Sequence, residues 1–256
     1  MNLIKRILFK LFGLENYLKI VSSAFFFLYK TGLLRKSASI RHHYFVRKLI
    51  KNGDSIIDIG ANLGYYSVIF AGLTGDKGKV YSVEPVEPFR KVLKRNTKKF
   101  ENIEIVPYAL GRENDVTVKM GIPTGNKYLS HGRTQIIDKD FESRFTFDVT
   151  IMNPVEVFKS LEKLDYIKCD IEGYEGIVIP EMRPFISKYL PIMQIETGGE
   201  AKEKISALLT GYGYDAYDLV DSVLVKESLN RKKPIGDIFF IPDERLSELP
   251  DEIFKN

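Results

Sequence analysis

The chain contains very little cysteine and no long uninterrupted apolar run. Cys169 is the one cysteine among 256 residues, so no internal disulfide can form, and a reducing compartment such as the cytoplasm suits this composition. Apolar residues make up 44% and charged residues 28% of the chain, which excludes a disordered chain and a collagen. The lack of repeated long apolar runs excludes a multi-pass membrane protein. The length fits one large domain, or one domain with an appendage.

Acidic residues are scarce in the first 50 positions. Ten lysines and arginines there face Glu15 alone, a net charge of +9. Because the whole chain carries +4, residues 51–256 carry −5. The basic character therefore belongs to the N-terminal segment, which disfavours a nucleic-acid footprint over the whole protein.

The first 36 residues hold two apolar stretches flanked by basic residues. Apolar side chains at helical spacing in residues 3–12 predict a short amphipathic helix that ends at Gly13. A second apolar run, from Ile20 to Tyr29, spans ten residues, whereas a membrane-spanning helix needs about 20. Nineteen residues of mixed charge precede this run, which is unlike a signal peptide.

Two interpretations of this segment stay open. In one, residues 1–50 form a helical appendage packed on the main domain, residues 51–256, or on a second subunit. In the other, residues 1–36 lie on an anionic membrane, with their lysines and arginines at the headgroups.

From residue 51 onward, short β-branched runs alternate with helical stretches. Such alternation predicts an α/β fold with a parallel sheet and helices on both of its faces. The predicted strands are Ser55–Ile59, Lys79–Val83, Ile103–Val106, Tyr166–Ile171, Pro191–Ile195, Asp215–Val220 and Asp237–Ile241, and the helices include Glu87–Lys99 and Lys202–Thr210.

Residues 112–150 do not follow this alternation of strands and helices. Val116–Met120 fits an edge strand, and residues 121–147 are rich in glycine, proline, threonine, asparagine and charged residues. Long irregular loops are often functional, so we expect a flap that faces the substrate. His131 lies in this stretch and is a candidate general base.

The most informative motif is Asp58-Ile59-Gly60-Ala61-Asn62-Leu63-Gly64, which follows a strand and opens a helix. Glycines there allow a tight turn and a close approach of the backbone to a ligand. A dinucleotide fingerprint needs glycine at positions 62 and 65, where this chain has Asn62 and Tyr65. A carboxylate at Asp58 would repel phosphates and attract a cationic ligand such as S-adenosylmethionine.

An acid also ends the second predicted strand. Glu84 follows Gly64 by twenty residues, the spacing at which a carboxylate accepts hydrogen bonds from both ribose hydroxyls of a nucleoside. The turn and the two acids together predict an S-adenosylmethionine site rather than an NAD site.

The segments DIGANLGYYS, VEPVEPFRKVLKRN, NIEIVPYALG, LDYIKCDIEGYE and LPIMQIET, in this order, resemble the FkbM family of S-adenosylmethionine-dependent methyltransferases. The resemblance implies a Rossmann-like class I methyltransferase fold, with a seven-stranded, mostly parallel sheet whose last strand is antiparallel. It implies O-methylation of a hydroxyl on a sugar, glycan or other small molecule. By the same resemblance, the cofactor residues are Asp58, Gly60, Ala61, Asn62, Gly64, Glu84, Pro85, Tyr108, Ala109 and Asp170.

One position departs from the family pattern. The family often has an aspartate before the helix that precedes the fourth strand, where this chain reads Asn153-Pro154. This pair is a good helix start, because asparagine caps helices and proline suits their first turn. The change matters only if the aspartate has a chemical role.

Methyl transfer to an alcohol needs a group that removes the hydroxyl proton. Asp170 and Glu172 are two residues apart at the end of the fourth predicted strand, so we expect both on one face, and Glu196 ends the neighbouring strand. Two close carboxylates raise the pKa of one of them, which suits a general base. They also suit a divalent metal that acidifies the hydroxyl. Asp170, Glu172, Glu196 and His131 are the catalytic candidates.

The remaining polar residues of note are expected to have structural rather than catalytic roles. His42 and His43 have no metal-ligand spacing with acids and are expected at the surface, while Cys169 is expected to be a packed, inert thiol. The basic stretch Arg90–Lys99 is expected to be a solvated helix face. Alternative functions are a catalytically degenerate scaffold, for which Asn153 is the hint, and a methyltransferase acting on nitrogen or nucleic acid. The Asn/Asp-Pro-Pro-aromatic motif of amino-group methylases is absent from the sequence.

Overall fold

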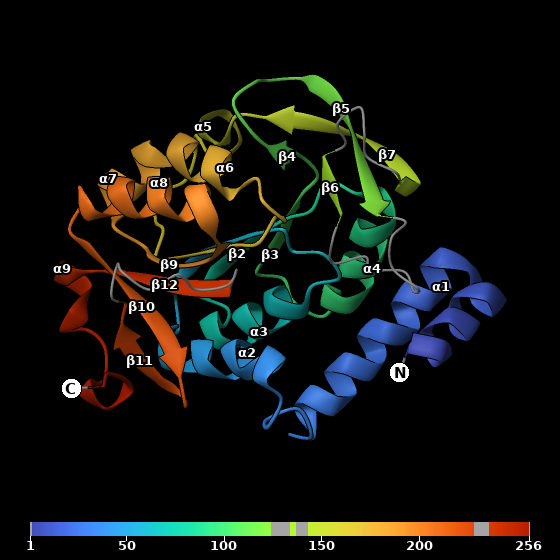
Figure 1. Ribbon diagram of the computed structural model, residues 1–256, viewed down its shortest axis with the longest axis horizontal. Helices are drawn as coiled ribbons and strands as arrows, with labels where there is room; N and C mark the ends of the chain where they lie inside the picture. Colours follow the sequence, from blue (N-terminus) through green and yellow to red (C-terminus); the bar gives the residue numbers. More distant parts are fainter. Residues whose placement is uncertain (1, 124–133, 137–142, 228–235, 256) are drawn as a thin grey trace.

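Figure 1 shows the computed structural model, which describes residues 2–123, 134–136, 143–227 and 236–255. Its centre is an eight-stranded sheet. In spatial order the strands are β11 (Val223–Lys226), β10 (Tyr214–Val220), β12 (Gly236–Pro242), β9 (Ile192–Thr197), β8 (Tyr166–Cys169), β1 (Ser55–Ile59), β2 (Lys79–Val83) and β3 (Ile103–Val106). Strands β9, β8, β1, β2 and β3 are parallel neighbours, and β12 runs antiparallel to β9. The Rossmann-like α/β fold with an antiparallel strand near one edge is confirmed.

The eighth strand was not expected from the sequence. Strand β11 pairs antiparallel with β10, and the two are joined at Asp221 and Ser222, whose φ angles are 47° and 67°. Two consecutive positive φ angles are typical of the turn that closes a two-residue hairpin. The sheet therefore continues one strand beyond the seven that the family resemblance implied.

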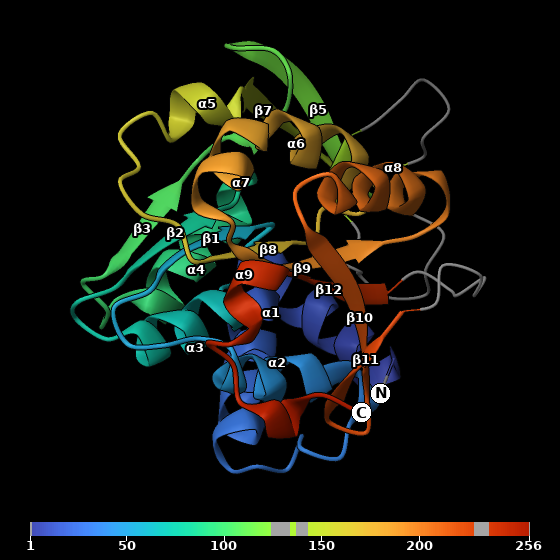
Figure 2. The ribbon, with the colours of Figure 1, turned by 90° about the vertical axis from the view of Figure 1, so that its left-hand side faces the viewer.

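Helices cover both faces of the sheet (Figures 1 and 2). One layer contains α1 (Asn2–Lys30), α2 (Arg41–Phe45), α3 (Tyr65–Thr74) and α4 (Glu87–Thr97), with the short 3-10 turns Ala38–Ile40 and Val46–Lys48. The other contains α5 (Pro154–Val157), α6 (Glu175–Glu181), α7 (Arg183–Tyr189) and α8 (Gly199–Thr210). The chain closes with α9 (Asp243–Leu246) and a 3-10 turn, Asp251–Ile253. Two apolar clusters, one on each face of the sheet, form most of the core, and a third joins α1 and α4 to the second sheet.

A second, four-stranded sheet stands above the first (Figure 1). It consists of β4 (Ala109–Leu110), β7 (Ser143–Met152), β5 (Val116–Pro123) and β6 (Gln135–Ile136). The strand expected at 116–120 is confirmed within β5, but it is not an edge strand, because β5 pairs with both β7 and β6. The expectation that residues 121–147 are irregular is wrong at 121–123 and 135–136, which belong to β5 and β6, and from residue 143 onward. The physical reason is an alternation of apolar and polar residues from Phe145 to Ile151, which pairs β7 with β5 along its length. His131 lies outside the described residues.

Helix α1 packs alongside α4 and bends at Gly13, whose φ is 69° and ψ 179°. The expected end of the first amphipathic helix at Gly13 is therefore confirmed as a break. Tyr17 and Leu18 are fully buried, and Arg95 Nη2 donates to Ser23 Oγ at 3.2 Å. By length and composition the stretch Ile7–Lys30 is long enough to cross a membrane, which the ten-residue apolar run alone had not suggested.

The two histidines after this helix do not lie at the surface, which corrects the sequence-based expectation. His42 is buried, with Nδ1 3.5 Å from Asp237 Oδ2. The ring of His43 stacks on Tyr66 at 3.9 Å between centroids, and burial, together with the nearby Lys168 charge, lowers the pKa of His43 to about 3. The burial of His42 and the partial burial of His43 follow from the packing of α2 against the sheet, where His42 and Phe45 both contact Phe239 of β12.

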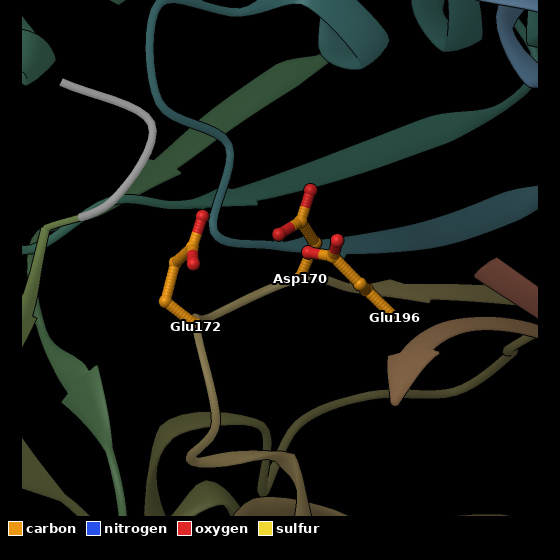
Figure 3. Close-up of side chains that lie close together, drawn as sticks. All are labelled: Asp170, Glu172 and Glu196. Carbon is orange, nitrogen blue, oxygen red and sulfur yellow. The ribbon is translucent and has the colours of Figure 1, made fainter. Parts of the chain in front are cut away.

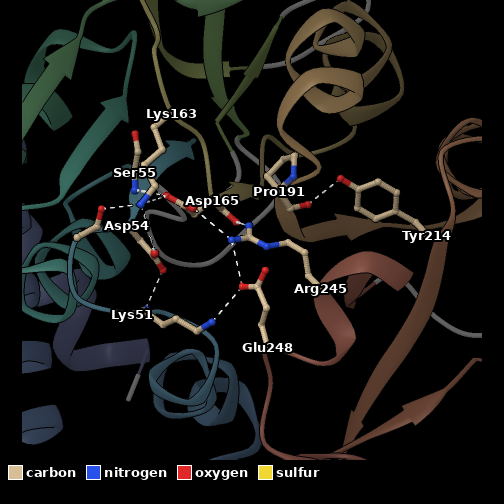
Figure 4. Close-up of polar contacts among 10 residues, drawn as sticks. Lys51, Asp54, Ser55, Lys163, Asp165, Pro191, Tyr214, Arg245 and Glu248 are labelled. Atoms are coloured by element: carbon tan, nitrogen blue, oxygen red, sulfur yellow. Dashed lines mark hydrogen bonds and ion pairs between the residues drawn. The ribbon is translucent and has the colours of Figure 1, made fainter.

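The amino ends of β1 and β8 are joined to the C-terminal helix α9 by a polar network (Figure 4). Asp165 Oδ2 accepts a hydrogen bond from the Ser55 backbone N–H at 2.8 Å. Arg245 donates to the Asp165 carbonyl oxygen at 2.8 Å and to its Oδ1 at 3.2 Å. This network stabilises the edge of the sheet opposite the strand ends that form the site.

Candidate active site

A cavity of about 340 Å³ opens at the carboxyl ends of β1, β2 and β8. This is the edge at which open α/β sheets bind ligands. Its wall contains eight of the residues singled out from the sequence: Gly60, Asn62, Glu84, Pro85, Tyr108, Ala109, Asp170 and Glu172. Met120, Thr134, Gln135 and Ile136 close it from the second sheet.

The turn after β1 brings the backbone against the neighbouring strand end. Gly60 has a φ of 81°, and a Cβ there would lie 2.0 Å from the Asp170 carbonyl oxygen. Gly64 has a φ of 85° and starts α3, where a Cβ would lie 2.7 Å from Leu93 Cδ1. Only glycine fits either position, so both glycines are required for the turn itself. Ala61 belongs to the same turn, and its N–H donates to the Val83 carbonyl oxygen at 2.9 Å.

Glu84 lies at the end of β2 with its carboxylate fixed by backbone groups. Oε1 accepts from the Val86 N–H at 2.8 Å, and Oε2 accepts from the Asn62 N–H at 2.9 Å. Burial raises the pKa of Glu84 to about 7, although both hydrogen bonds and Arg90 oppose the shift. Arg90 Nη1 donates to the Glu84 carbonyl oxygen at 3.2 Å, so this arginine supports the turn rather than simply facing solvent.

Asp58 is fully buried under the turn and does not line the cavity. Its Oδ2 accepts from Ser67 Oγ at 2.6 Å, and Ser67 Oγ accepts in turn from Ser82 Oγ at 2.9 Å. Burial raises the pKa of Asp58, while the Lys168 charge acts in the opposite direction. The structure therefore places this carboxylate among core polar groups, one layer below the ligand-facing surface.

Three carboxylates gather at the ends of β8 and β9 (Figure 3). One oxygen from each of Asp170, Glu172 and Glu196 lies within 4.8 Å of the other two. The three carboxylates are therefore close together, as expected, but Asp170 and Glu172 are not brought together by lying on one face of a strand. Strand β8 ends at Cys169, so Asp170 and Glu172 lie in a turn, and Glu172 has a φ of 56°.

Lys168, which was not a candidate from the sequence, stabilises the ionised form of Asp170. Its side chain is 3% exposed, and Nζ donates to Asp170 Oδ2 at 2.8 Å. Burial alone would raise the pKa of Asp170, but the Lys168 charge and the hydrogen bonds from Glu196 and Lys168 bring that pKa below its ordinary value. Conversely, the carboxylates of Asp170 and Asp58 raise the pKa of Lys168 despite its burial.

The pKa of Glu196 is shifted in the opposite direction from that of Asp170. Its hydrogen bond with Asp170 and its burial raise the pKa of Glu196 to about 9. At neutral pH the Asp170–Glu196 pair therefore holds one proton on the Glu196 side and a negative charge on Asp170.

Glu175 is a second residue that the sequence analysis missed. Its carboxylate accepts from the Ile171 N–H at 2.8 Å and from the Gly173 N–H at 3.0 Å. These hydrogen bonds hold the turn that carries Glu172.

Asn153 lies away from this site, at the start of α5. Its Oδ1 accepts from the Val155 N–H at 2.9 Å, and Pro154 occupies the first turn. The expected helix cap is confirmed, and Asn153 is not among the residues that line the cavity.

The comparisons with known proteins identify the family of this chain. The profile of the methyltransferase FkbM domain matches residues 58–216. The chain belongs to the FkbM methyltransferase family. The match includes the turn after β1, Glu84 and all three carboxylates, and it confirms the resemblance read from the sequence motifs.

Two curated relatives are also methyltransferases. The probable cobalt-precorrin-6B C(15)-methyltransferase (decarboxylating) of Saccharolobus solfataricus is 27% identical over 133 residues, 48% of this chain and 66% of the relative. The protein-L-isoaspartate O-methyltransferase of Methanosarcina mazei is 32% identical over 59 residues, 22% of this chain and 24% of the relative. This FkbM chain therefore matches less than two thirds of the length of either relative.

Among solved structures, the methyltransferase FkbM of Methylobacillus flagellatus has a TM-score of 0.45 and 17% identity, covering 73% of this chain and 43% of its own. The fibrillarin of Aeropyrum pernix, solved with natively bound S-adenosyl-L-methionine, has a TM-score of 0.44 and 16% identity, covering 75% of this chain and 68% of its own.

The cofactor of this FkbM chain is S-adenosylmethionine, and the residues of the cavity fit it. The Glu84 carboxylate faces the cavity and is fixed in place, so it can accept the two ribose hydroxyls. Val86, Phe89, Tyr108 and Leu110 form an apolar wall that suits an adenine ring. Among the described residues, no lysine or arginine lines the cavity.

Proposed function

We propose that this protein transfers a methyl group from S-adenosylmethionine to a hydroxyl oxygen of a small-molecule or glycan acceptor in the cytoplasm. The observation that carries the proposal is the cluster of three carboxylates, of which Asp170 and Glu172 line the cofactor cavity and Glu196 lies beside them. When bound, the cofactor supplies an electrophilic methyl group on a sulfonium. The protein must then orient the acceptor and remove its proton.

We assign Glu172 as the general base. Asp170 is a poor base because its pKa lies below the ordinary value, and Glu196 is a poor base because it is protonated at neutral pH. Glu172 lines the cavity beside both of them. A positioned carboxylate of this kind contributes about 10²–10⁴-fold to the rate.

Asp170 and Glu196 then have a supporting role in the proposed reaction. The negative charge held on Asp170 by Lys168 favours a cationic ligand at the end of β8. Protonated Glu196 is a hydrogen-bond donor, which suits an acceptor oxygen or the Asp170 carboxylate. A divalent metal on the same three oxygens is the alternative way to acidify the hydroxyl.

Ligand binding and turnover can be tested separately. S-adenosylhomocysteine at 100 times its dissociation constant adds about 2.7 kcal/mol to the free energy of unfolding, which raises the melting temperature by roughly 5–10 °C. We expect this shift for the wild type and for Glu172→Gln, and its loss in Glu84→Ala. NAD and ATP serve as control ligands and should give no shift.

Turnover is then measured with radiolabelled S-adenosylmethionine and a panel of hydroxylated acceptors, and the product is analysed for an O-methyl signal by NMR. We expect methylated product from the wild type and at least about 100-fold less from Glu172→Gln. Product methylated on carbon or nitrogen would contradict the proposal. So would a thermal shift without product over the whole panel and with metal added, which would favour a degenerate scaffold.

A further inference from the structure

A second groove, of about 600 Å³, lies between α1, α2, α3 and α4, on the helical layer away from the carboxylate cluster. Its floor is apolar and includes Phe26, Ile69, Leu73 and Phe100. Four cationic residues line it: Lys30, Arg35, Arg47 and Lys99. No carboxylate lines it among the residues that the structure describes.

Three of these cations lie over aromatic rings, and Lys99 Nζ is 4.7 Å from the centroid of the Phe100 ring. The Arg35 guanidinium carbon lies 5.9 Å from the centroid of the Tyr44 ring. Arg47 lies 5.7 Å from the Tyr29 ring centroid and donates from Nε to the Tyr29 hydroxyl at 3.2 Å. Within the described part of the chain, none of the four cations forms an ion pair with a carboxylate. The groove therefore concentrates positive charge that the protein itself does not neutralise.

Exposed apolar side chains are concentrated in α1 and in the turn that follows it. Nine large apolar side chains are exposed among the residues whose burial the structure describes, and six of them lie between positions 7 and 33. Phe27 is 66% exposed and Leu33 is 69% exposed, and they are close in sequence to Lys30 and Arg35. Large exposed apolar residues next to unpaired cations are the pattern of a helix that lies in a membrane interface.

We propose that the α1 side of the protein docks on a membrane surface that contains anionic phospholipid. The groove receives the phosphate of a lipid headgroup between Lys30, Arg35, Arg47 and Lys99, and Phe27 and Leu33 enter the interfacial region. A soluble phosphate would use the cations alone, whereas a bilayer uses the cations and the apolar side chains together. This proposal goes beyond methyl transfer and does not depend on it.

The arrangement also links the membrane to the cavity. Phe9 of α1 packs edge-on against Phe145 of β7, with 5.9 Å between ring centroids. The sheet that contains β7 supplies part of the cavity wall through Met120, Gln135 and Ile136. Docking through α1 would therefore fix the position of the cavity relative to the lipid surface.

The test is flotation of the full chain with vesicles of phosphatidylcholine alone or with 30 mol% phosphatidylglycerol. We expect binding to the anionic vesicles at about 50 mM salt and weakening at about 500 mM, because salt screens exposed charges. Each cation near a lipid surface contributes about fivefold in affinity. The double variant K30E/R35E should therefore bind at least about 25-fold more weakly, and F27S/L33S should weaken the binding that remains at high salt.

The matched control is K159E/K204E, which reverses two exposed lysines, one in the turn after α5 and one in α8, two elements of the other helical layer. It should bind like the wild type, and all variants should show the wild-type circular dichroism and melting temperature. Equal binding to both vesicle types, or equal loss in the control, would overturn the proposal.

Three further results would assign the groove differently and so overturn it. A thermal shift with inorganic phosphate but no vesicle binding would indicate a soluble phosphate ligand. Binding of a labelled RNA oligonucleotide without vesicle binding would indicate a nucleic acid. Retention in the vesicles after alkaline carbonate would indicate that residues 7–30 cross the bilayer.

Discussion

The Nζ atom of Lys168 lies 2.8 Å from Oδ2 of Asp170, with the lysine side chain almost completely buried in β8. A lysine in the middle of a parallel sheet is costly unless a carboxylate compensates its charge. Here two carboxylates do so, since Asp58 and Asp170 both raise the pKa of Lys168. The ion pair thus connects the buried polar core below the turn to the carboxylate cluster at the cavity.

Replacing Lys168 by methionine should change both stability and the pH dependence of activity. Loss of one partner of a buried ion pair costs about 3–5 kcal/mol in the free energy of unfolding. The pKa of Asp170 is lowered in the folded protein, so the pair stabilises the fold above the unfolded pKa of the aspartate, and this contribution is lost as the pH falls through the folded pKa. Without Lys168 that pKa rises, and the acidic limb of kcat/KM should move up by about 1–3 pH units.

Urea unfolding at pH 7 and a pH–rate profile test this prediction. Lys159→Met, at an exposed lysine, is the control and should change neither quantity. An unchanged acidic limb in K168M, with stability lost as expected, would leave Lys168 a purely structural role.

Cofactor affinity should depend on the ionisation of Glu84. Its pKa is about 7, so near pH 6 about nine tenths of the carboxyl groups are protonated and cannot accept two ribose hydroxyls. Binding of S-adenosylhomocysteine should therefore be about tenfold weaker at pH 6 than at pH 8. Isothermal titration calorimetry at pH 6, 7 and 8 measures this directly.

The Gln variant of the same residue is the control for this pH effect. Glu84→Gln should bind weakly at every pH, because its side chain has no group that titrates in this range. If it showed the same tenfold pH dependence as the wild type, another group would be responsible.

The sequence predicted the parts of the fold that depend on local pattern. Strands β1, β2 and β3 were predicted with their observed bounds, because each is a short β-branched run that glycine, proline or charged residues enclose. Strand β7 was missed although Phe145, Phe147, Val149 and Ile151 alternate regularly, because the composition before it indicated a loop.

The sequence predicted which residues form the site better than it predicted their interactions and protonation states. Glu84, Asp170 and Glu172 follow from motif and strand order, and all three line the cavity. The segment YIKC alone did not reveal the role of Lys168. That role depends on the Asp58 carboxylate, which lies opposite Lys168 in the pairing of β1 with β8. The burial of His42 and the partial burial of His43 likewise depend on long-range contacts with Asp237 and Tyr66.

Glu196 should tolerate glutamine but not alanine. Because its pKa is about 9, the carboxyl is protonated at neutral pH, and a glutamine amide can donate the same hydrogen bond to Asp170. We expect Glu196→Gln to keep activity within about threefold at pH 7, whereas Glu196→Ala loses at least about tenfold, since one hydrogen bond to a charged group is worth about 1.5–3 kcal/mol.

Steady-state rates at pH 7, with and without EDTA, distinguish this proton from a metal. Loss of activity in Glu196→Gln, combined with stimulation of the wild type by Mn²⁺ and its inhibition by EDTA, would contradict the shared proton and identify the three carboxylates as metal ligands.

Glu172 should show opposite effects on stability and on turnover. Its φ of 56° is unusual for a residue with a Cβ, and this conformation costs roughly 1–2 kcal/mol. Glycine has no such cost, so Glu172→Gly should raise the free energy of unfolding by about 1 kcal/mol while it abolishes turnover. Glu172→Ala is the matched comparison: it removes the same carboxylate but keeps the Cβ, so it should lose turnover without the gain in stability. If both variants were equally stable, the backbone conformation would not be strained. If both kept turnover, the proton acceptor would lie elsewhere in the cavity.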